Sequence, residues 1–337
     1  RPVLIDTLSF EQLKEGAPWI AYRQFCQHFL APLALMSYRN PALGQLSRIH
    51  IDGVPLDQAA ELLPFRARFR MPLLLHIYLH ARSQRKHSSK STPVGKEEAP
   101  QKRAFTMQAF KGLIESLRGV IAKMEPAKGD SHWIDYYAEA SHYSSASADH
   151  KRELVAAFIE QAGPQTVWDL GANTGAFSRI SSERGIRTIA FEMDPQSVGE
   201  AYRQAKANGD ENLLPLVCDL TNPSSGLGWA GEERMSLAER GPADLLLALA
   251  LIHHLAIANN VPLGKVADYF ATLGKRLVIE FVPKTDEKVQ HLLASREDIF
   301  PTYTREGFEE AFKGRFDVER VEEIKGSERV LYLMRAR

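Results

Sequence analysis

The sequence predicts an α/β fold: a Rossmann-like, doubly wound sheet of seven strands, preceded by an N-terminal helical domain. Three observations lead to this prediction. Short apolar runs alternate with helical stretches over the second half of the chain, which is typical of βαβ units in a parallel sheet. A glycine-containing turn follows the first of these runs, at residues 171–175. The last two runs are joined by a loop too short for a crossover helix, so the last two strands should be antiparallel.

The N-terminal region, residues 1–81, is expected to be mainly helical. Within residues 19–38, apolar side chains recur at steps of three and four, which indicates an amphipathic helix. Pro32 marks a kink or a break in this helix. The chain opens on Arg1 and not on Met, so this region is compatible with the end of a larger module.

Two segments separate this region from the sheet. Residues 82–104 combine seven Lys or Arg with only two Glu and several Ser and Pro, which predicts a flexible basic linker. The alternative is a basic tether that binds nucleic-acid or membrane phosphates. Residues 105–147 are predicted to form a helical lid or substrate region, in which one amphipathic helix spans 106–124 with Thr106 as its N-cap.

The sheet domain is predicted over residues 148–337 and begins with a helix at about 148–161. Five strands should be parallel, and they are expected at 166–170, 188–191, 214–218, 244–251 and 276–281. The last two, at 316–321 and 330–334, should form the antiparallel pair.

Composition limits the classes of function. The 337 residues carry 42 basic and 42 acidic side chains, and 44% of them are hydrophobic, as in ordinary globular proteins. Nucleic acid is not an expected partner, because a dedicated nucleic-acid-binding domain is usually basic. Cys26 and Cys218 are far apart in the sequence, which favours a reducing, cytoplasmic setting. The longest apolar stretch, 62–79, contains three arginines and should not span a membrane. The oligomeric state is left open.

The turn after the first strand is the central motif, V-W-D-L-G-A-N-T-G-A-F at 167–177. Gly171 and Gly175 permit backbone conformations and close approaches that a side chain would forbid. The motif does not match the dinucleotide fingerprint, because Asn173 and Ala176 occupy the second and third glycine positions. Taken alone, it is also compatible with a simple tight turn between strand and helix.

Carboxylates follow the next two strands. Glu192 ends the second strand, 23 residues after Asp169, where a carboxylate can accept hydrogen bonds from both hydroxyls of a ribose. Asp194 is the rival, although Asp-Pro is more typical of a helix cap. Asp219 ends the third strand and is alternatively a turn or cap residue. Three polar residues at three successive strand ends are a more specific signal than any one of them.

The fourth motif spans residues 244–255 and contains an uninterrupted apolar run, 245–252, which is followed by His253 and His254. Such a run suits a strand buried on both faces at the centre of a parallel sheet. Either histidine is a candidate general base, since imidazole titrates near neutrality. The alternatives are a packing role or a metal ligand, but no acidic cluster nearby supports a metal site.

These motifs resemble those of class I S-adenosylmethionine-dependent methyltransferases. The resemblance implies that the acid-x-Gly-x-Gly-x-Gly loop, with Asn173 at its middle glycine, faces the methionine part of S-adenosylmethionine. It further implies that Glu192 binds the ribose, Met193 flanks the adenine, and Asp219 with the following amide reads the adenine ring. The residues implied to contact the cofactor are Asp169, Gly171, Ala172, Asn173, Gly175, Glu192, Met193, Asp219, Leu220 and Ala248.

Four longer stretches, at 17–33, 167–177, 247–263 and 280–304, resemble a bacterial methyltransferase family that includes nodulation proteins of the NoeA type. We therefore expect methyl transfer from S-adenosylmethionine to a small or saccharide-like acceptor, with His253 or His254 as base. The expected acceptor contacts are Trp133, Tyr137, Tyr143 and Tyr303. RNA or protein acceptors, or a non-catalytic cofactor-binding scaffold, are the alternatives. An NAD-dependent oxidoreductase is disfavoured because the glycine fingerprint is absent.

Overall fold

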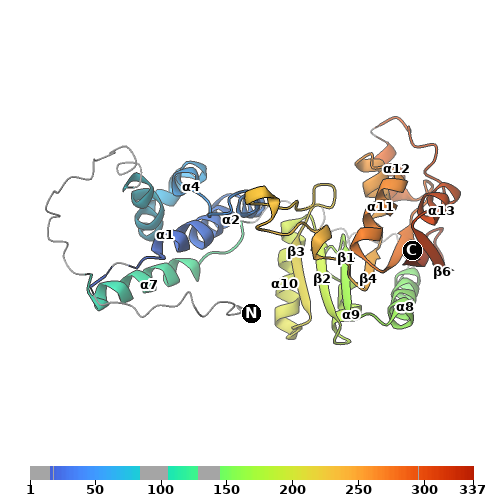
Figure 1. Ribbon diagram of the computed structural model, residues 1–337, viewed down its shortest axis with the longest axis horizontal. Helices are drawn as coiled ribbons and strands as arrows, with labels where there is room; N and C mark the ends of the chain where they lie inside the picture. Colours follow the sequence, from blue (N-terminus) through green and yellow to red (C-terminus); the bar gives the residue numbers. More distant parts are fainter. Residues whose placement is uncertain (1–15, 18, 84–104, 128–144, 295) are drawn as a thin grey trace. The chain divides into compact units, whose positions relative to one another are not determined.

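A computed structural model describes residues 16–17, 19–83, 105–127, 145–294 and 296–337 of the chain. The chain divides into two compact units, residues 1–129 and residues 130–337 (Figure 1).

The described part of the N-terminal unit is mainly helical, with one isolated β-bridge between Gly16 and Phe105. Its elements are α1 (Tyr22–Phe25), η1 (Cys26–Leu30), α2 (Ala31–Tyr38), η2 (Pro41–Gln45), α3 (Leu46–Ile49), α4 (Leu56–Leu62), η3 (Phe65–Phe69), α5 (Met71–Leu73), η4 (Leu74–Leu79) and α7 (Met107–Ile121). Pro32 does not break the first helix. The π-helical turn η1 runs directly into α2, and Pro32 lies in the first turn of α2, where its missing N–H is tolerated.

Helix α7 belongs to the core of this unit. Thr106 is its N-cap, as the sequence predicts, and its hydroxyl accepts a hydrogen bond from the Ala109 amide at 3.2 Å. Leu117 and Val120 are buried in the same apolar cluster as residues of η1 and α4. The sequence groups this helix with the following segment, up to residue 147. The structure places it with the N-terminal helices because its apolar stripe is buried among them.

The C-terminal unit contains a seven-stranded sheet with the order β3-β2-β1-β4-β5-β7-β6 (Figure 1). The first five strands, β1 (Thr166–Leu170), β2 (Arg187–Glu192), β3 (Leu213–Val217), β4 (Leu245–Ala248) and β5 (Arg276–Phe281), pair in parallel. Strand β7 (Val330–Ala336) pairs antiparallel with both β5 and β6 (Phe316–Glu323). The predicted fold class and the antiparallel final pair are confirmed.

Helices cover both faces of this sheet, which makes it doubly wound. They are α8 (Ser145–Ala162), α9 (Ser178–Ser182), α10 (Pro195–Asn208), η5 (Trp229–Gly231), η6 (Ala238–Arg240), η7 (His254–Ala258), α11 (Leu263–Leu273), α12 (Glu287–Leu293) and α13 (Arg305–Lys313). Alternate residues of β4 face opposite layers. Leu246 packs with α11 and α13, whereas Leu245 and Leu247 pack with α8 and α9. In the described part of the chain, no helix is both long and apolar enough to cross a membrane.

Candidate active site

A cavity of about 290 Å³ opens at the carboxyl ends of the parallel strands, where such sheets place their ligands. The loops after β1 and β4 and the ends of β2 and β3 form its walls, and η7 and α12 close one side. The residues that line it are Gly171, Asn173, Glu192, Met193, Cys218, Asp219, Leu220, Thr221, Leu249, Ala250, Leu251, His254, Leu255, Ala258, Asn259 and Leu292. The ends of four strands that are far apart in the sequence therefore meet in one hollow.

The loop after β1 adopts left-handed backbone at three alternate residues. Gly171 has φ +75°, Asn173 has φ 51° and Gly175 has φ +76°. Asparagine tolerates this region better than most side chains, which explains how Asn173 serves at the middle glycine position. Its side-chain oxygen also accepts a hydrogen bond from the Thr174 amide at 2.6 Å. A Cβ on Gly171 would lie 3.1 Å from Leu251 Cδ1, so this glycine keeps the floor of the cavity open.

Glu192 is held between two backbone amides. Its Oε2 accepts from the Asn173 amide and its Oε1 from the Asp194 amide, each at 2.9 Å. The side chain is buried, and this burial raises its pKa despite the hydrogen bonds. A carboxylate offers about four lone-pair sites, so it retains acceptor capacity toward the cavity. Asp194 instead caps α10 by accepting from the Gln196 and Ser197 amides, as the Asp-Pro pair indicates.

The end of β3 contributes the third polar group. Asp219 Oδ1 accepts from both the amide and the hydroxyl of Thr221, at 2.8 and 2.7 Å. Asp219 therefore stabilises a turn and also lines the cavity. Leu220 lies beside it, and Met193, 56% exposed, lies at the end of β2. Apolar side chains thus flank two carboxylates.

Only one of the two predicted histidines reaches the cavity. His254, the first residue of η7, lines it, and burial lowers its pKa to about 4. His253 is 0% exposed and does not line the cavity, and burial lowers its pKa well below the ordinary value of an imidazole. Within the described part of the chain, neither ring nitrogen of His253 has a hydrogen-bond partner. Both imidazoles are therefore neutral at pH 7. No group of three or more His, Cys, Asp or Glu among the described residues could hold a metal ion.

Comparison with known proteins places the chain in a family. No protein-family model matches it. Over 334 residues it is 36% identical to nodulation protein NoeA of Rhizobium meliloti (strain 1021), an alignment that covers 98% of this chain and 69% of NoeA. The chain belongs to the NoeA family. A shorter match, 33% identical over 81 residues, covers 23% of this chain and 35% of ribosomal RNA large subunit methyltransferase E of Wolbachia sp. subsp. Brugia malayi (strain TRS).

Several solved structures are similar to this NoeA-family chain at low identity. Magnesium protoporphyrin IX methyltransferase of Synechocystis PCC 6803, solved with bound SAM, is 16% identical with a TM-score of 0.40, covering 62% of this chain and 87% of the other. N-methyltransferase NodS of Bradyrhizobium japonicum WM9 is 11% identical with a TM-score of 0.40, covering 57% and 98%.

Four of the predicted cofactor residues support the cavity of this NoeA-family chain from behind and do not line it. Asp169 is buried and accepts a 2.5 Å hydrogen bond from the Ser178 hydroxyl, and burial raises its pKa to about 6. Ala172 and Ala248 are buried, and Gly175 forms the turn into α9. These residues fix the loop geometry, because three of them are small enough to pack closely and the Asp169 carboxylate has a hydrogen-bond partner in Ser178.

Of the four predicted acceptor contacts, the structure describes only Tyr303. Trp133, Tyr137 and Tyr143 lie outside the described residues. Tyr303 is 2% exposed, and its hydroxyl donates to the Val282 carbonyl at 2.9 Å. Its ring lies against Phe281, with 5.4 Å between the centroids. This packing keeps its hydroxyl out of the cavity of the NoeA-family chain.

Sequence reasoning missed one wall of the cavity. Its members are mostly apolar and come from the loop after β4, from η7 and from α12: Leu249, Ala250, Leu251, Leu255, Ala258, Asn259 and Leu292, joined by Cys218 and Thr221 near β3. The motif that begins at Asp244 predicts a strand as far as residue 251, but β4 ends at Ala248. Ala250 has φ 51°, which ends the strand and turns the next residues toward the cavity.

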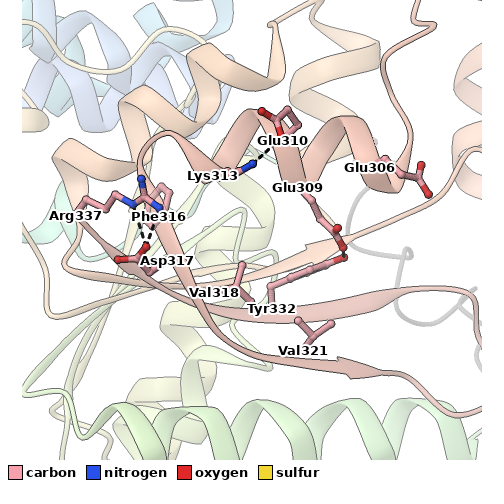
Figure 2. A pocket seen from close by; sticks show the side chains of 10 residues that line it. All are labelled: Glu306, Glu309, Glu310, Lys313, Phe316, Asp317, Val318, Val321, Tyr332 and Arg337. Atoms are coloured by element: carbon pink, nitrogen blue, oxygen red, sulfur yellow. Dashed lines mark hydrogen bonds and ion pairs between the residues drawn. The ribbon is translucent and has the colours of Figure 1, made fainter.

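A second hollow, of about 590 Å³, lies between α13 and β6 (Figure 2). Most of its polar groups have partners. Arg337 contacts Asp317 at 2.9 Å, Lys313 contacts Glu310 at 3.4 Å, and the Tyr332 hydroxyl donates to Glu309 at 2.7 Å. We assign it no ligand, since most of its polar groups already contact one another and it is built from the antiparallel edge of the sheet.

Proposed function

We propose that this NoeA-family protein is an S-adenosylmethionine-dependent methyltransferase that acts on a small or saccharide-like acceptor. The observation that carries the proposal is one cavity that collects the Gly171–Asn173 loop, the Glu192 carboxylate and the Asp219 carboxylate at three successive strand ends. The relative from Wolbachia is named a methyltransferase, which supports the same class of reaction.

The residues of the cavity fit this cofactor. Glu192 keeps acceptor capacity for ribose hydroxyls, and Asp219 lies on the neighbouring strand end for an adenine amino group. Leu220, Met193 and Leu255 supply apolar surface suited to the faces of the base. The left-handed turn at Gly171 allows the chain to lie close to the methionine part. When bound, the sulfonium supplies an activated methyl group, so that the protein contributes mainly proximity and orientation.

His254 is the residue best placed to act on the acceptor. It lines the cavity and is neutral at pH 7, so its imidazole is able to accept a proton from a hydroxyl or ammonium group. A pKa of about 4 makes it a weak base, so we assign it mainly the orientation and hydrogen bonding of the acceptor. His253 lies behind it, with 4.2 Å between the ring centroids, and serves as its packing partner.

The acceptor class rests on charge. With equal numbers of acidic and basic side chains, the chain does not have the overall basic excess that is typical of dedicated nucleic-acid-binding proteins. RNA is the competing acceptor, because the Wolbachia relative is named for ribosomal RNA. Mass-spectrometric profiling of methylated products, in extracts with and without the protein, would separate small molecules from RNA.

Calorimetry with S-adenosylhomocysteine and with NAD⁺ tests the cofactor. We expect micromolar binding of S-adenosylhomocysteine and none of NAD⁺; the reverse result would replace a methyltransferase by an oxidoreductase. Gly171→Ala should then weaken binding by about tenfold or more, since its Cβ would press on Leu251 and narrow the cavity.

Gly185→Ala is the matched control for this variant. Gly185 has φ +80°, so both alanines carry a similar left-handed strain of roughly 1–2 kcal/mol. A Cβ on Gly185 would meet no atom within 4 Å. Equal loss of affinity in the two variants would show that backbone strain alone, and not the shape of the cavity, explains the effect at Gly171.

A further inference from the structure

A buried carboxylate lies directly behind the loop after β4. Glu280, near the end of β5, is 0% exposed and does not line the cavity. Its Oε2 accepts from Lys151 Nζ at 2.6 Å and from the Ala250 amide at 2.7 Å. Its Oε1 faces Arg329 Nη1 at 3.4 Å. One carboxylate therefore joins α8, the loop after β4 and the residue before β7.

The Ala250 amide is the unusual partner in this cluster. Ala250 has φ 51°, a conformation that alanine adopts only against a steric penalty. The residues on either side of it, Leu249 and Leu251, also line the cavity. Leu251 packs against the position where a Cβ of Gly171 would stand. The conformation of this one alanine therefore sets the wall that faces the loop after β1.

The partners of Glu280 are themselves anchored to other parts of the site. Lys151 Nζ lies 4.7 Å from the centroid of the Phe177 ring, at the start of α9. Arg329 Nε donates to Asp286 at 2.7 Å, and Asp286 is the N-cap of α12, which places Leu292 in the cavity. The cluster thus links two walls of the cavity without contacting its contents.

We propose that Glu280, held by Lys151, is a positioning residue that fixes the left-handed conformation of Ala250 and so shapes the cofactor cavity. The inference rests on the proposed function, since it concerns the same cavity. A stabilising role alone is a poor explanation for these charges. Well-packed apolar side chains often stabilise a core no less than a buried ion pair does, and their burial requires no desolvation of charge. The charge-assisted bond to a strained amide is what an apolar pair could not supply.

Glu280→Gln tests the proposal, with Glu319→Gln as the matched control. Glu319 pairs with Arg276 at the opposite end of β5, 3.2 Å away, so this control removes an ion pair from the same strand without touching Ala250. We expect Glu280→Gln to raise the Kd for S-adenosylhomocysteine by about tenfold or more, the usual effect of losing a group that orients a binding site. Glu319→Gln should leave this Kd unchanged.

Rescue by glycine separates positioning from general stability. Ala250→Gly allows φ near 51° without a steric penalty, so the loop depends less on the carboxylate. The double variant Glu280→Gln/Ala250→Gly should recover most of the affinity while its melting temperature stays below that of the native protein. Failure of glycine to restore binding, or an unchanged Kd in Glu280→Gln, would overturn the proposal.

Lys151→Met provides a second route if Glu280→Gln does not fold. It removes Nζ but leaves the carboxylate between Ala250 and Arg329. We expect a smaller rise in Kd, about threefold, that Ala250→Gly reverses. An unchanged Kd here would again contradict the positioning role. If the native protein binds no S-adenosylhomocysteine at all, the proposed function fails. If the native protein binds S-adenosylhomocysteine and Glu280→Gln binds it with the same Kd, the positioning role of Glu280 is overturned while the proposed function stands.

Discussion

The burial of His254 predicts a pH-dependent loss of stability that a single substitution should remove. In the folded protein the pKa of this imidazole falls from 6.5 to about 4 because burial disfavours its charged form. A depressed histidine pKa means that the unfolded chain binds more protons between these two values. The free energy of unfolding should therefore fall as the pH is lowered from about 6.5 to 4.

The magnitude follows from the shift. At about 1.4 kcal/mol for each pKa unit, a change from 6.5 to about 4 corresponds to roughly 3 kcal/mol. Two buried carboxyls act in the opposite direction. Burial raises the pKa of Asp169 to about 6 and also raises that of Glu192, so their stabilisation is present at low pH and is lost as the pH rises. The native protein alone would show only the balance of these effects.

The assay is therefore a comparison of the native protein with His254→Gln. Urea unfolding at pH 4 to 7 should give a difference in unfolding free energy between the two proteins that changes by about 3 kcal/mol over this range. His291→Gln, which removes an exposed imidazole from α12 of the same unit, is the control. An NMR titration that finds the His254 ring protonating near pH 6.5, or a pH-independent difference between the two proteins, would refute the burial argument.

Two further predictions concern the roles of neighbouring groups. Glu192→Ala should weaken the binding of S-adenosylhomocysteine by roughly 1.5–3 kcal/mol, the usual loss for charge-assisted hydrogen bonds. Asp194→Ala should cost about 1 kcal/mol of stability as a lost N-cap and leave this affinity almost unchanged. Calorimetry ranks the two variants by affinity and thermal melting ranks them by stability, and the opposite order would reassign the ribose ligand. Once an acceptor is identified, His254→Gln should lower kcat by about 100-fold, because the acceptor is then no longer held in the reactive orientation. His253→Gln should mainly lower the melting temperature, and a larger kcat effect at His253 would exchange their roles.

Much of the fold was predictable because it depends on local pattern. Strand β1 and strand β5 have the bounds that their apolar runs predict, since a strand buried on both faces needs an uninterrupted apolar segment. The polar residues at strand ends were also predictable. The carboxyl ends of parallel strands meet at one edge, so Glu192 and Asp219 were expected to lie near one another, and both line the cavity. Asp169, the polar residue at the end of the first strand, lies behind the cavity instead.

The remainder depends on contacts that no local pattern reveals. Ala250 lies inside an apolar run that predicts a continued strand, and the carboxylate that accepts from its amide, Glu280, is 30 residues away in the sequence. Lys151 precedes Glu280 by 129 residues, so their pairing appears only when α8 packs on β5. The same holds for His253 and His254. They are adjacent in sequence and of the same type, but at the start of η7 only the His254 side chain lines the cavity.

The hydrogen bonds around Glu192 preorganise the site for ligand binding. The Asn173 and Asp194 amides hold both carboxylate oxygens before any ligand arrives, and Asn173 is itself fixed by the hydrogen bond that its side chain accepts from Thr174. A carboxylate that is already oriented loses little conformational freedom when it accepts further hydrogen bonds, so more of the interaction energy remains as affinity. Burial raises the cost of its negative charge, and the two amides offset part of that cost. The loop after β1 and the end of β2 therefore form one preformed unit, in which the left-handed conformation of Asn173 directs its amide toward the Glu192 carboxylate.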